Sequence, residues 1–139
     1  MPDMLAIGKH ILASQPFSLL IKTEITQFAV GQVELKIPIT PELKQQHGFL
    51  HGGVLGYAAD NALTFAGGSS MAVPVVTSEF KINYVRPAIG EMLIARANTV
   101  YVGKTQAVCR CELFVVKDGV EKLCALAQGT IVRISQERS

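Results

Sequence analysis

Apolar residues near the start of the chain recur at near-helical spacing. They are Leu5, Ile7, Ile11 and Leu12. This periodicity is typical of a short amphipathic helix, which would span residues 4–14. We expect Gln15-Pro16 to end it.

From Leu19 onward the pattern becomes the alternation of a β-strand. A turn is expected near Gly31, and beyond it three apolar residues alternate with three polar ones. A period of two places the two sets on opposite faces of a strand. We therefore predict a hairpin with one face exposed to water, in which the alternating residues are Val33, Leu35 and Ile37 against Gln32, Glu34 and Lys36.

The segment that starts at Gly52 is apolar on nearly every side when it is wound as a helix. Its apolar residues are Val54, Leu55, Tyr57, Ala58, Ala59, Ala62, Leu63, Phe65 and Ala66. Such a helix belongs in the middle of a protein. We expect Gly67-Gly68 to end it, because glycine adopts the left-handed conformation at a helix C-terminus at little cost.

Beyond Pro74 the chain has almost entirely the pattern of β-structure. The predicted strands span residues 75–84, 92–102, 105–116 and 123–134, with turns at Gly103-Lys104 and Asp118-Gly119. An antiparallel sheet can curl around one apolar helix and bury it. We predict a single α+β domain over residues 1–139, in which a sheet of about five or six strands surrounds one long central helix.

Composition and charge exclude several kinds of partner. Charged residues make up 17% of the 139 residues, the formal net charge is +2, and the basic residues are scattered. Binding to a nucleic acid backbone needs a concentrated basic surface, so no nucleic acid partner is expected. No segment has the apolar length that a membrane span or a signal core requires. We therefore expect no membrane association and a cytoplasmic location.

The three cysteines form an odd set without a C-x-x-C pair. Cys109 and Cys111 alternate in a predicted strand and would share one face, and Cys124 stands alone. Neither histidines nor acids lie at ligand spacing nearby. We expect reduced core residues and no metal site, with His10 and His47 at the surface.

Asp60 is the anomalous residue of the central helix. Its neighbours are alanine, leucine and tyrosine. Aspartate is a poor helix former and is costly to bury without partners. A carboxylate at such a position indicates a functional group or, alternatively, a hydrogen bond that ties the helix to a strand.

The sequence His51-Gly52-Gly53 precedes or opens the same helix. Glycine removes side-chain bulk, so that unpaired N–H groups of the first turn can point at a ligand oxygen, aided by the helix dipole. This is how an oxyanion hole is built. The alternative is that His51 is only a capping or packing residue.

The spacing of these features predicts a dimer. Gly53 and Asp60 are seven residues apart, which returns to the same helix face but leaves roughly 10 Å along the axis. One helix cannot bring both to a single carbonyl group. Two helices packed antiparallel across a two-fold axis could do so, with Gly52 of one subunit opposite Asp60 of the other.

Taken together, these motifs resemble the phenylacetate-degradation (PaaI-like) branch of the hotdog-fold thioesterases. The resemblance extends from about Leu19 to Ile134, and the N-terminal helix is less diagnostic. It rests on Leu50-His51-Gly52-Gly53, Asp60-Asn61, the run Phe80-Lys81-Ile82-Asn83-Tyr84-Val85-Arg86-Pro87, and Gly103-Lys104-Thr105.

The resemblance implies roles for individual residues. Asp60 matches the catalytic acid, either as the nucleophile on the thioester carbonyl or as a general base for water. The backbone N–H of Gly52 matches the group that polarises that carbonyl, with His51 beside it. Thr77 falls where relatives have a small hydroxyl that positions the carboxylate or the water. Gln45 falls where some relatives carry an asparagine that holds the water.

Further contacts with CoA are implied. Lys104 and Thr105 match a turn that lies near the CoA phosphates in relatives, and Arg86 could add charge there, although both features also fit an ordinary solvated turn. Gly53 and Asn61, which adjoin the two main site residues, are expected to contact the substrate.

The resemblance implies hydrolysis of acyl-CoA thioesters with a small to medium or aromatic acyl group, without a metal or redox cofactor. The expected assembly is a homodimer that pairs into a dimer of dimers. Two alternatives stay open: a non-catalytic acyl-CoA-binding hotdog module, and a hotdog dehydratase that uses a histidine with an acid. Four residues either line an acyl pocket or belong to the core: Tyr57, Phe65, Met71 and Phe80.

Overall fold

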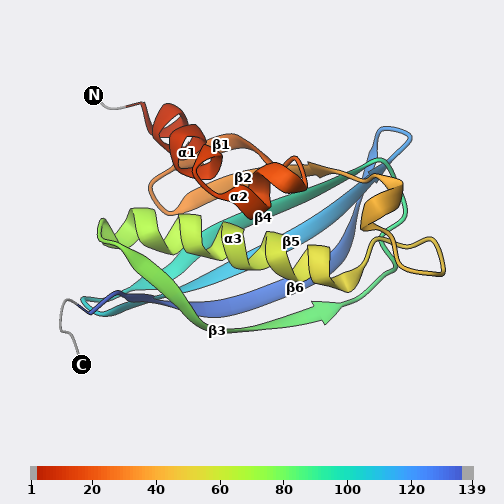
Figure 1. The fold of residues 1–139 in the computed structure, drawn as a ribbon. Coiled ribbons are helices and arrows are strands. Elements are labelled where there is room, and N and C mark those ends of the chain that lie inside the picture. Colours follow the sequence, from red (N-terminus) through yellow and green to blue (C-terminus); the bar gives the residue numbers. More distant parts are fainter. Residues whose placement is uncertain (1–2, 136–139) are drawn as a thin grey trace.

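The structure is a computed structural model that describes residues 3–135. Its main feature is a six-stranded antiparallel sheet in the order β1-β2-β4-β5-β6-β3. Figure 1 shows one long helix, α3, lying along the concave side of this sheet. The elements are α1 (Met4–Ala13), α2 (Pro16–Leu20), β1 (Glu24–Ala29), β2 (Gln32–Pro38), the 3-10 turn η1 (Pro41–Leu43), α3 (Gly52–Met71), β3 (Val75–Tyr84), β4 (Met92–Val102), β5 (Gln106–Lys117) and β6 (Val120–Arg133).

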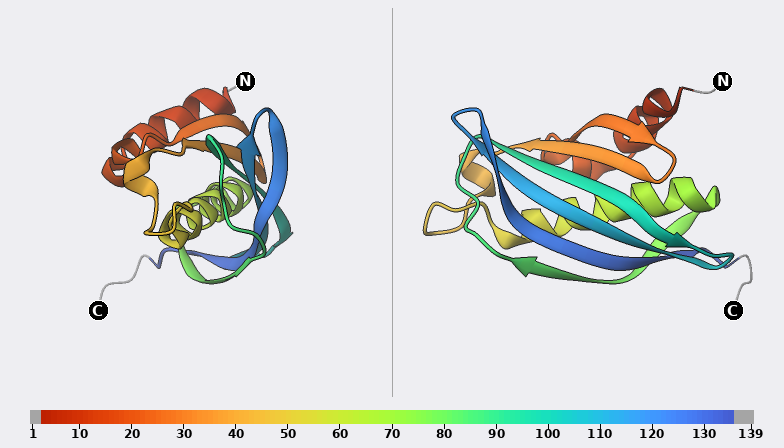
Figure 2. Two further views of the ribbon diagram at one scale, coloured as in Figure 1. Left: turned by 90° about the vertical axis from the view of Figure 1, so that its right-hand side faces the viewer. Right: turned by 180° about the vertical axis from the view of Figure 1, so that it is seen from behind.

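The core lies between α3 and the sheet that curves around it (Figure 2). The helix contributes four buried alanines beside larger apolar residues, and the strands contribute several branched side chains that face it. Completely buried side chains include Ala58, Ala59, Ala62 and Leu63 from the helix, and Leu35, Leu93, Leu113 and Ile131 from the strands. Alanines let the helix axis approach the sheet, so that branched side chains of the strands fill the space between them.

The predicted sheet is confirmed in its strands and turns. Two predicted strands, residues 75–84 and 92–102, match β3 and β4. Gly31 at the first hairpin and Asp118 with Gly119 at the last have positive φ, as tight turns require. Cys109, Cys111 and Cys124 are buried and free, which confirms their place in the core.

The prediction that Gly67-Gly68 ends the central helix is wrong. The helix continues to Met71, and Ala72 takes the left-handed conformation at its end. A Cβ atom added to Gly67 would lie 2.9 Å from the Ile131 side chain and 3.1 Å from Cys109 Sγ. Gly67 therefore serves close packing between helix and sheet, which the sequence pattern did not distinguish from a stop signal.

The expected β-structure from Leu19 onward is also wrong at its start. Residues Pro16–Leu20 form the short helix α2, and the first strand begins only at Glu24. Pro16 stands in the first turn of α2, where its missing N–H costs no hydrogen bond. The same residue therefore ends one helix and starts the next.

One stripe of α3 is not covered by the sheet. Gly56, Asp60 and Thr64 lie on it and are partly exposed, although the sequence pattern indicated burial on nearly every side. Neither α3 nor any other helix within residues 3–135 is both long and apolar enough to span a bilayer. The open stripe leaves Asp60 accessible from outside the chain.

The close packing of α3 against the sheet at Gly67 can be tested by measuring the free energy of unfolding. We expect Gly67→Ala to lower the free energy of unfolding by about 1–3 kcal/mol, because the added methyl group overlaps Ile131 and Cys109. Gly56→Ala in the same helix is the control for packing within one chain, since there its Cβ would meet only the Tyr84 hydroxyl, at 4.0 Å. In dissociated subunits that variant should be as stable as the wild type or more stable by up to about 1 kcal/mol.

Urea denaturation of the three proteins, at one protein concentration, measures both changes. Equal effects of the two substitutions would contradict the assignment of Gly67 to helix–sheet packing.

Candidate active site

Asp60 lies at the middle of α3 and is half-buried. Its Oδ1 atom accepts a hydrogen bond of 2.6 Å from the hydroxyl of Thr77 on β3. The pairing of β3 with β6 shifts register just after Thr77, as in a β-bulge, a feature that redirects side chains. The second carboxylate oxygen, Oδ2, has no hydrogen-bond partner within residues 3–135. One oxygen is thus fixed and the other is available to a ligand.

Thr64 completes this cluster, and the sequence analysis missed it. Its hydroxyl lies one helical turn after Asp60 and donates to the Asp60 carbonyl oxygen at 2.8 Å. It also lies 2.9 Å from the Thr77 hydroxyl. The available signal was the spacing of four residues, which places a hydroxyl next to the aspartate on one helix face.

The entrance of α3 leaves one backbone donor free. His51 is the N-cap residue, and its Nδ1 atom accepts a hydrogen bond of 2.8 Å from the Gly53 N–H. The Gly52 N–H has no partner within the described part of the chain. Tyr84 Oη donates to the Gly52 carbonyl oxygen at 3.2 Å. Of the two glycines at the N-terminus of α3, Gly52 and not Gly53 therefore presents an N–H group without a partner among residues 3–135, at the positive end of the helix dipole.

A cavity of about 400 Å³ lies at this helix entrance, and both Gly52 and Gln45 line it. The Gln45 Oε1 atom accepts hydrogen bonds from the N–H groups of His47 (2.6 Å) and Phe49 (3.2 Å). Its Nε2 atom has no partner among residues 3–135. Gln45 can therefore act toward a ligand in this cavity only as a donor. The sequence predicted that Gln45 holds the water, and it did not indicate that the Gln45 side-chain oxygen is occupied by backbone N–H groups.

Gly52 and Asp60 occupy separate places on the surface of one chain. Eight residues of a straight helix separate them, which corresponds to roughly 12 Å along the axis. Asp60 does not line the cavity at the helix entrance. A single chain therefore does not offer the free N–H and the carboxylate to the same small group.

The other predicted contact residues are dispersed. Arg86 follows β3 and lines the cavity at the start of α3. Lys104 and Thr105 form the turn after β4, a strand whose Thr99 accepts a hydrogen bond from Ser70 in the last turn of α3. The basic residues thus lie at opposite ends of the helix, and one chain does not bring them together.

Asn61 is engaged in a polar network with the N-terminal segment. Its Nδ2 atom donates to Gln15 Oε1 and to the Tyr57 hydroxyl, both at 3.1 Å. The Tyr57 hydroxyl also contacts the hydroxyls of Ser18 and Thr23. Asn61 therefore connects α3 to α2 and to the residues around it.

The four apolar candidates for a pocket belong mainly to the core. Phe65 packs edge-on against Phe28 with ring centroids 5.4 Å apart, and Met71 and Phe80 pack against buried residues. Tyr57 packs edge-on against Phe17. Phe65 also lines a cavity, which lies beside Thr64.

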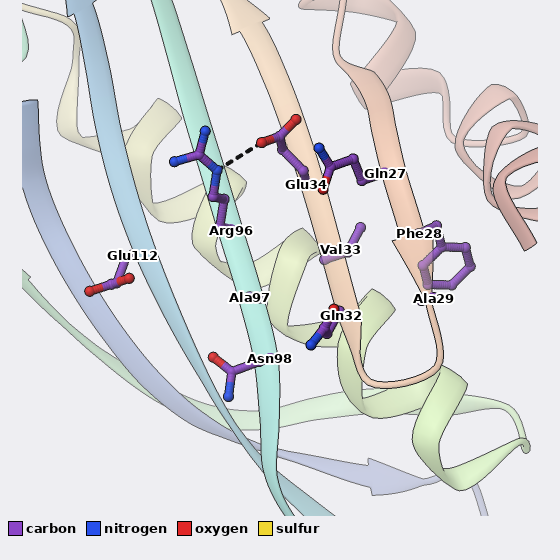
Figure 3. A pocket seen from close by; sticks show the side chains of 10 residues that line it. All are labelled: Gln27, Phe28, Ala29, Gln32, Val33, Glu34, Arg96, Ala97, Asn98 and Glu112. Atoms are coloured by element: carbon purple, nitrogen blue, oxygen red, sulfur yellow. Dashed lines mark hydrogen bonds and ion pairs between the residues drawn. The ribbon is translucent and has the colours of Figure 1, made fainter. Parts of the chain in front are cut away.

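A second polar cluster lies on the other face of the sheet. Figure 3 shows Glu34 and Arg96 on neighbouring strands, joined by an ion pair of 2.7 Å beside a cavity of about 360 Å³. Burial tends to raise the pKa of Glu34, but hydrogen bonds from Thr26 and Arg96 outweigh it and hold the pKa below its usual value. The ion pair with Arg96 compensates the buried negative charge of Glu34. The cluster contains none of the predicted site residues.

The cysteines are unsuited to nucleophilic chemistry. Burial raises the pKa of Cys111 to about 12 and that of Cys124 to about 11, and it also raises the pKa of Cys109. The thiolate is the reactive form, so these thiols stay protonated and inert near neutral pH. Asp60 remains the candidate for the reacting group.

Comparison with known proteins gives one consistent family. The model of the thioesterase superfamily matches residues 47–122. A relative from Saccharolobus solfataricus that bears the name esterase is 30% identical over 132 residues, covering 93% of this chain and 86% of that protein. A 1,4-dihydroxy-2-naphthoyl-CoA hydrolase from Listeria monocytogenes is 25% identical over 113 residues, covering 80% of this chain and 89% of the hydrolase.

A solved structure supports the same assignment. A thioesterase family protein from Silicibacter pomeroyi superposes with a TM-score of 0.86 at 35% identity, covering 88% of this chain and 92% of that one. The predicted hotdog fold is thereby confirmed. The chain belongs to the thioesterase superfamily, and it is a thioester hydrolase.

Proposed function

We propose that the protein hydrolyses acyl-CoA thioesters with small to medium or aromatic acyl groups, using Asp60 of one subunit and the Gly52 N–H of another. The observation that carries the proposal is the half-buried Asp60, which has one oxygen held by Thr77 and the other free. The free N–H of Gly52 supplies the complementary group. Family membership supports thioester hydrolysis, and these two groups specify how it proceeds.

The chemistry requires a nucleophile and a site for negative charge. Either Asp60 Oδ2 attacks the thioester carbonyl carbon, or Asp60 removes a proton from a water molecule that attacks it. The carbonyl oxygen becomes an oxyanion, which the Gly52 N–H and the helix dipole stabilise. The carbon–sulfur bond then breaks and CoA leaves as a thiolate that takes up a proton. In the first route, water hydrolyses the resulting anhydride at Asp60.

A two-fold dimer resolves the separation of Gly52 and Asp60. β3 is an edge strand whose outer N–H and C=O groups have no strand partner among residues 3–135, and Val76 on it is 49% exposed. Pairing of two β3 strands across a two-fold axis would satisfy these groups. It would also set the two α3 helices antiparallel, with the entrance of one beside the middle of the other. Further pairing into a dimer of dimers is part of the proposal.

The remaining contacts concern CoA. In the antiparallel dimer the start of one α3 lies beside the middle of the other, as Gly52 and Asp60 require. Arg86, and separately Lys104 with Thr105, would contribute to binding the CoA phosphates. The Gln45 amide would donate to the thioester or to water at the same site. The reaction proceeds in the cytoplasm with protein groups and water, without a cofactor.

The dehydratase alternative is disfavoured by His51. Its Nδ1 atom accepts a hydrogen bond from the Gly53 N–H, so the ring holds the helix entrance instead of working with an acid. A non-catalytic binding module would leave unexplained why Asp60 keeps one oxygen free on an open stripe of α3. We therefore place hydrolysis first.

Replacement of Asp60 by asparagine tests the reacting group. The change is nearly isosteric and keeps an oxygen that can accept from Thr77, so the fold should persist. We expect kcat to fall by about a hundredfold or more, because the amide is neither a nucleophile nor a base. Release of free thiol from a panel of acyl-CoAs measures the loss. Asp118→Asn, in the exposed turn after β5, is the matched control and should keep wild-type kcat. Undiminished turnover by Asp60→Asn would refute the proposal.

Removal of the Gly52 N–H tests the oxyanion donor. Gly52 is the first residue of α3, and His51 before it has an extended backbone, so proline fits there without loss of the helix. Gly52→Pro should lower kcat by about 10²–10³-fold. Gly52→Ala keeps the N–H, and its Cβ would meet Tyr84 at an ordinary 3.5 Å, so its kcat should stay much closer to the wild-type value. Equal activities of the two variants would rule out this donor.

A further inference from the structure

A cavity of about 320 Å³ opens beside the Asp60 cluster. Thr64 lies in its wall, and the Thr64 hydroxyl contacts both the Asp60 carbonyl oxygen and the Thr77 hydroxyl. The cavity is formed by α1, α3 and the start of β3. The Thr64 and Thr77 hydroxyls therefore connect the wall of this cavity to the Asp60 carboxylate, which acts in the proposed reaction.

The lining fits an apolar group of limited size. Ile11, Phe65 and the segment 73–75 contribute apolar side chains. Binding cavities for small molecules have volumes of roughly 300–1,000 Å³, so this one is at the lower end of that range. Gln15 Nε2 and Asn61 Oδ1 have no hydrogen-bond partner within the described part of the chain, and both residues line the cavity. A compact acyl group, branched or with one ring, matches this space better than a long unbranched chain.

The wall formed by α1 lies outside the segment that defines the family. The family model matches residues 47–122 and thus covers Gly52, Asp60 and Thr77. Ile11 and Gln15 precede that segment by more than thirty residues. The reacting groups lie in the segment that the family model matches, and one wall of the cavity lies in the N-terminal helix, outside that segment.

We infer that this cavity holds the acyl group of the substrate, and that Ile11 on α1 limits the size of acyl group that is accepted. The inference rests on the proposed hydrolysis at Asp60. It assigns to the N-terminal helix a role in specificity that is distinct from the chemistry.

Ile11 has a closely matched control on the same helix. Ile7 lies one turn earlier, and both isoleucines are 42% exposed, but only Ile11 lines the cavity. Substitutions at two such partly exposed positions should have similar, small effects on stability. A difference in specificity between them therefore reports on the cavity.

The experiment compares Ile11→Phe, Ile11→Ala, Ile7→Phe and Ile7→Ala with the wild type. For each protein, kcat/KM is measured with acetyl-CoA, hexanoyl-CoA and benzoyl-CoA. Acetyl-CoA carries the smallest of the three acyl groups and is the internal reference. Ile11→Phe should lower the ratio of benzoyl-CoA or hexanoyl-CoA turnover to acetyl-CoA turnover by about tenfold, and Ile11→Ala should raise the hexanoyl ratio. The Ile7 variants should change the ratios by less than about twofold.

Unchanged ratios in the Ile11 variants, or equal changes in the Ile7 variants, would overturn the inference while leaving the hydrolysis intact. If the wild type hydrolyses none of the three thioesters, the proposed function fails instead. Calorimetric binding of hexyl-CoA, a thioether that cannot be hydrolysed, then tests the cavity separately. Weaker binding to Ile11→Phe than to Ile7→Phe supports the cavity, and equal affinities overturn it.

Discussion

The fixed rise of an α-helix, about 1.5 Å per residue, is the constraint on which the proposed site depends. Gly52 and Asp60 lie on one straight helix, so their separation cannot be closed by side-chain motion. The cap formed by His51 uses the Gly53 N–H and leaves that of Gly52 free. If the free donor and the carboxylate act on one thioester, as proposed, they need a second helix that runs in the opposite direction. In the proposed site, catalysis therefore depends on assembly.

The position of the Asp60 carboxylate depends on small residues on the opposite face of α3. Alanines and Gly67 on the far side of α3 let the helix lie close to β5 and β6, which fixes its distance from the sheet. β3 runs along the edge of the same sheet, and its irregular pairing occurs just after Thr77. Packing of the core and orientation of Asp60 are thus coupled, because both depend on how near α3 lies to the strands.

The two-residue alternation of apolar and polar residues, together with residue types typical of tight turns, sufficed to predict most of the sheet. The four long strands and the turns at Gly31 and Gly119 follow from local signals that tertiary packing reinforces. Gly67 failed as a stop signal because a glycine that allows close approach and one that ends a helix look the same in a sequence. The helix α2 was not predicted for a related reason, since a proline that ends one helix can also begin the next one.

Site residues could be predicted from the sequence where a residue differs in polarity from its neighbours. Asp60 was conspicuous because a charged residue interrupts an apolar helix. Thr64 was not, since threonine on a helix has many ordinary explanations and its contact with Thr77 depends on tertiary structure. The same holds for the wall that α1 contributes to the cavity beside Thr64, which joins segments more than fifty residues apart.

Complementation between two inactive subunits tests most directly the claim that each site is shared between two chains. Asp60→Asn and Gly52→Pro subunits are co-expressed with different tags, and the mixed dimer is isolated by both tags. One of its two sites then contains both defects and the other contains neither. The shared-site account predicts that the mixed dimer recovers up to about half of wild-type turnover, although each parent protein is nearly inactive. A mixed dimer as inactive as its parents would show that Gly52 and Asp60 do not act across the interface.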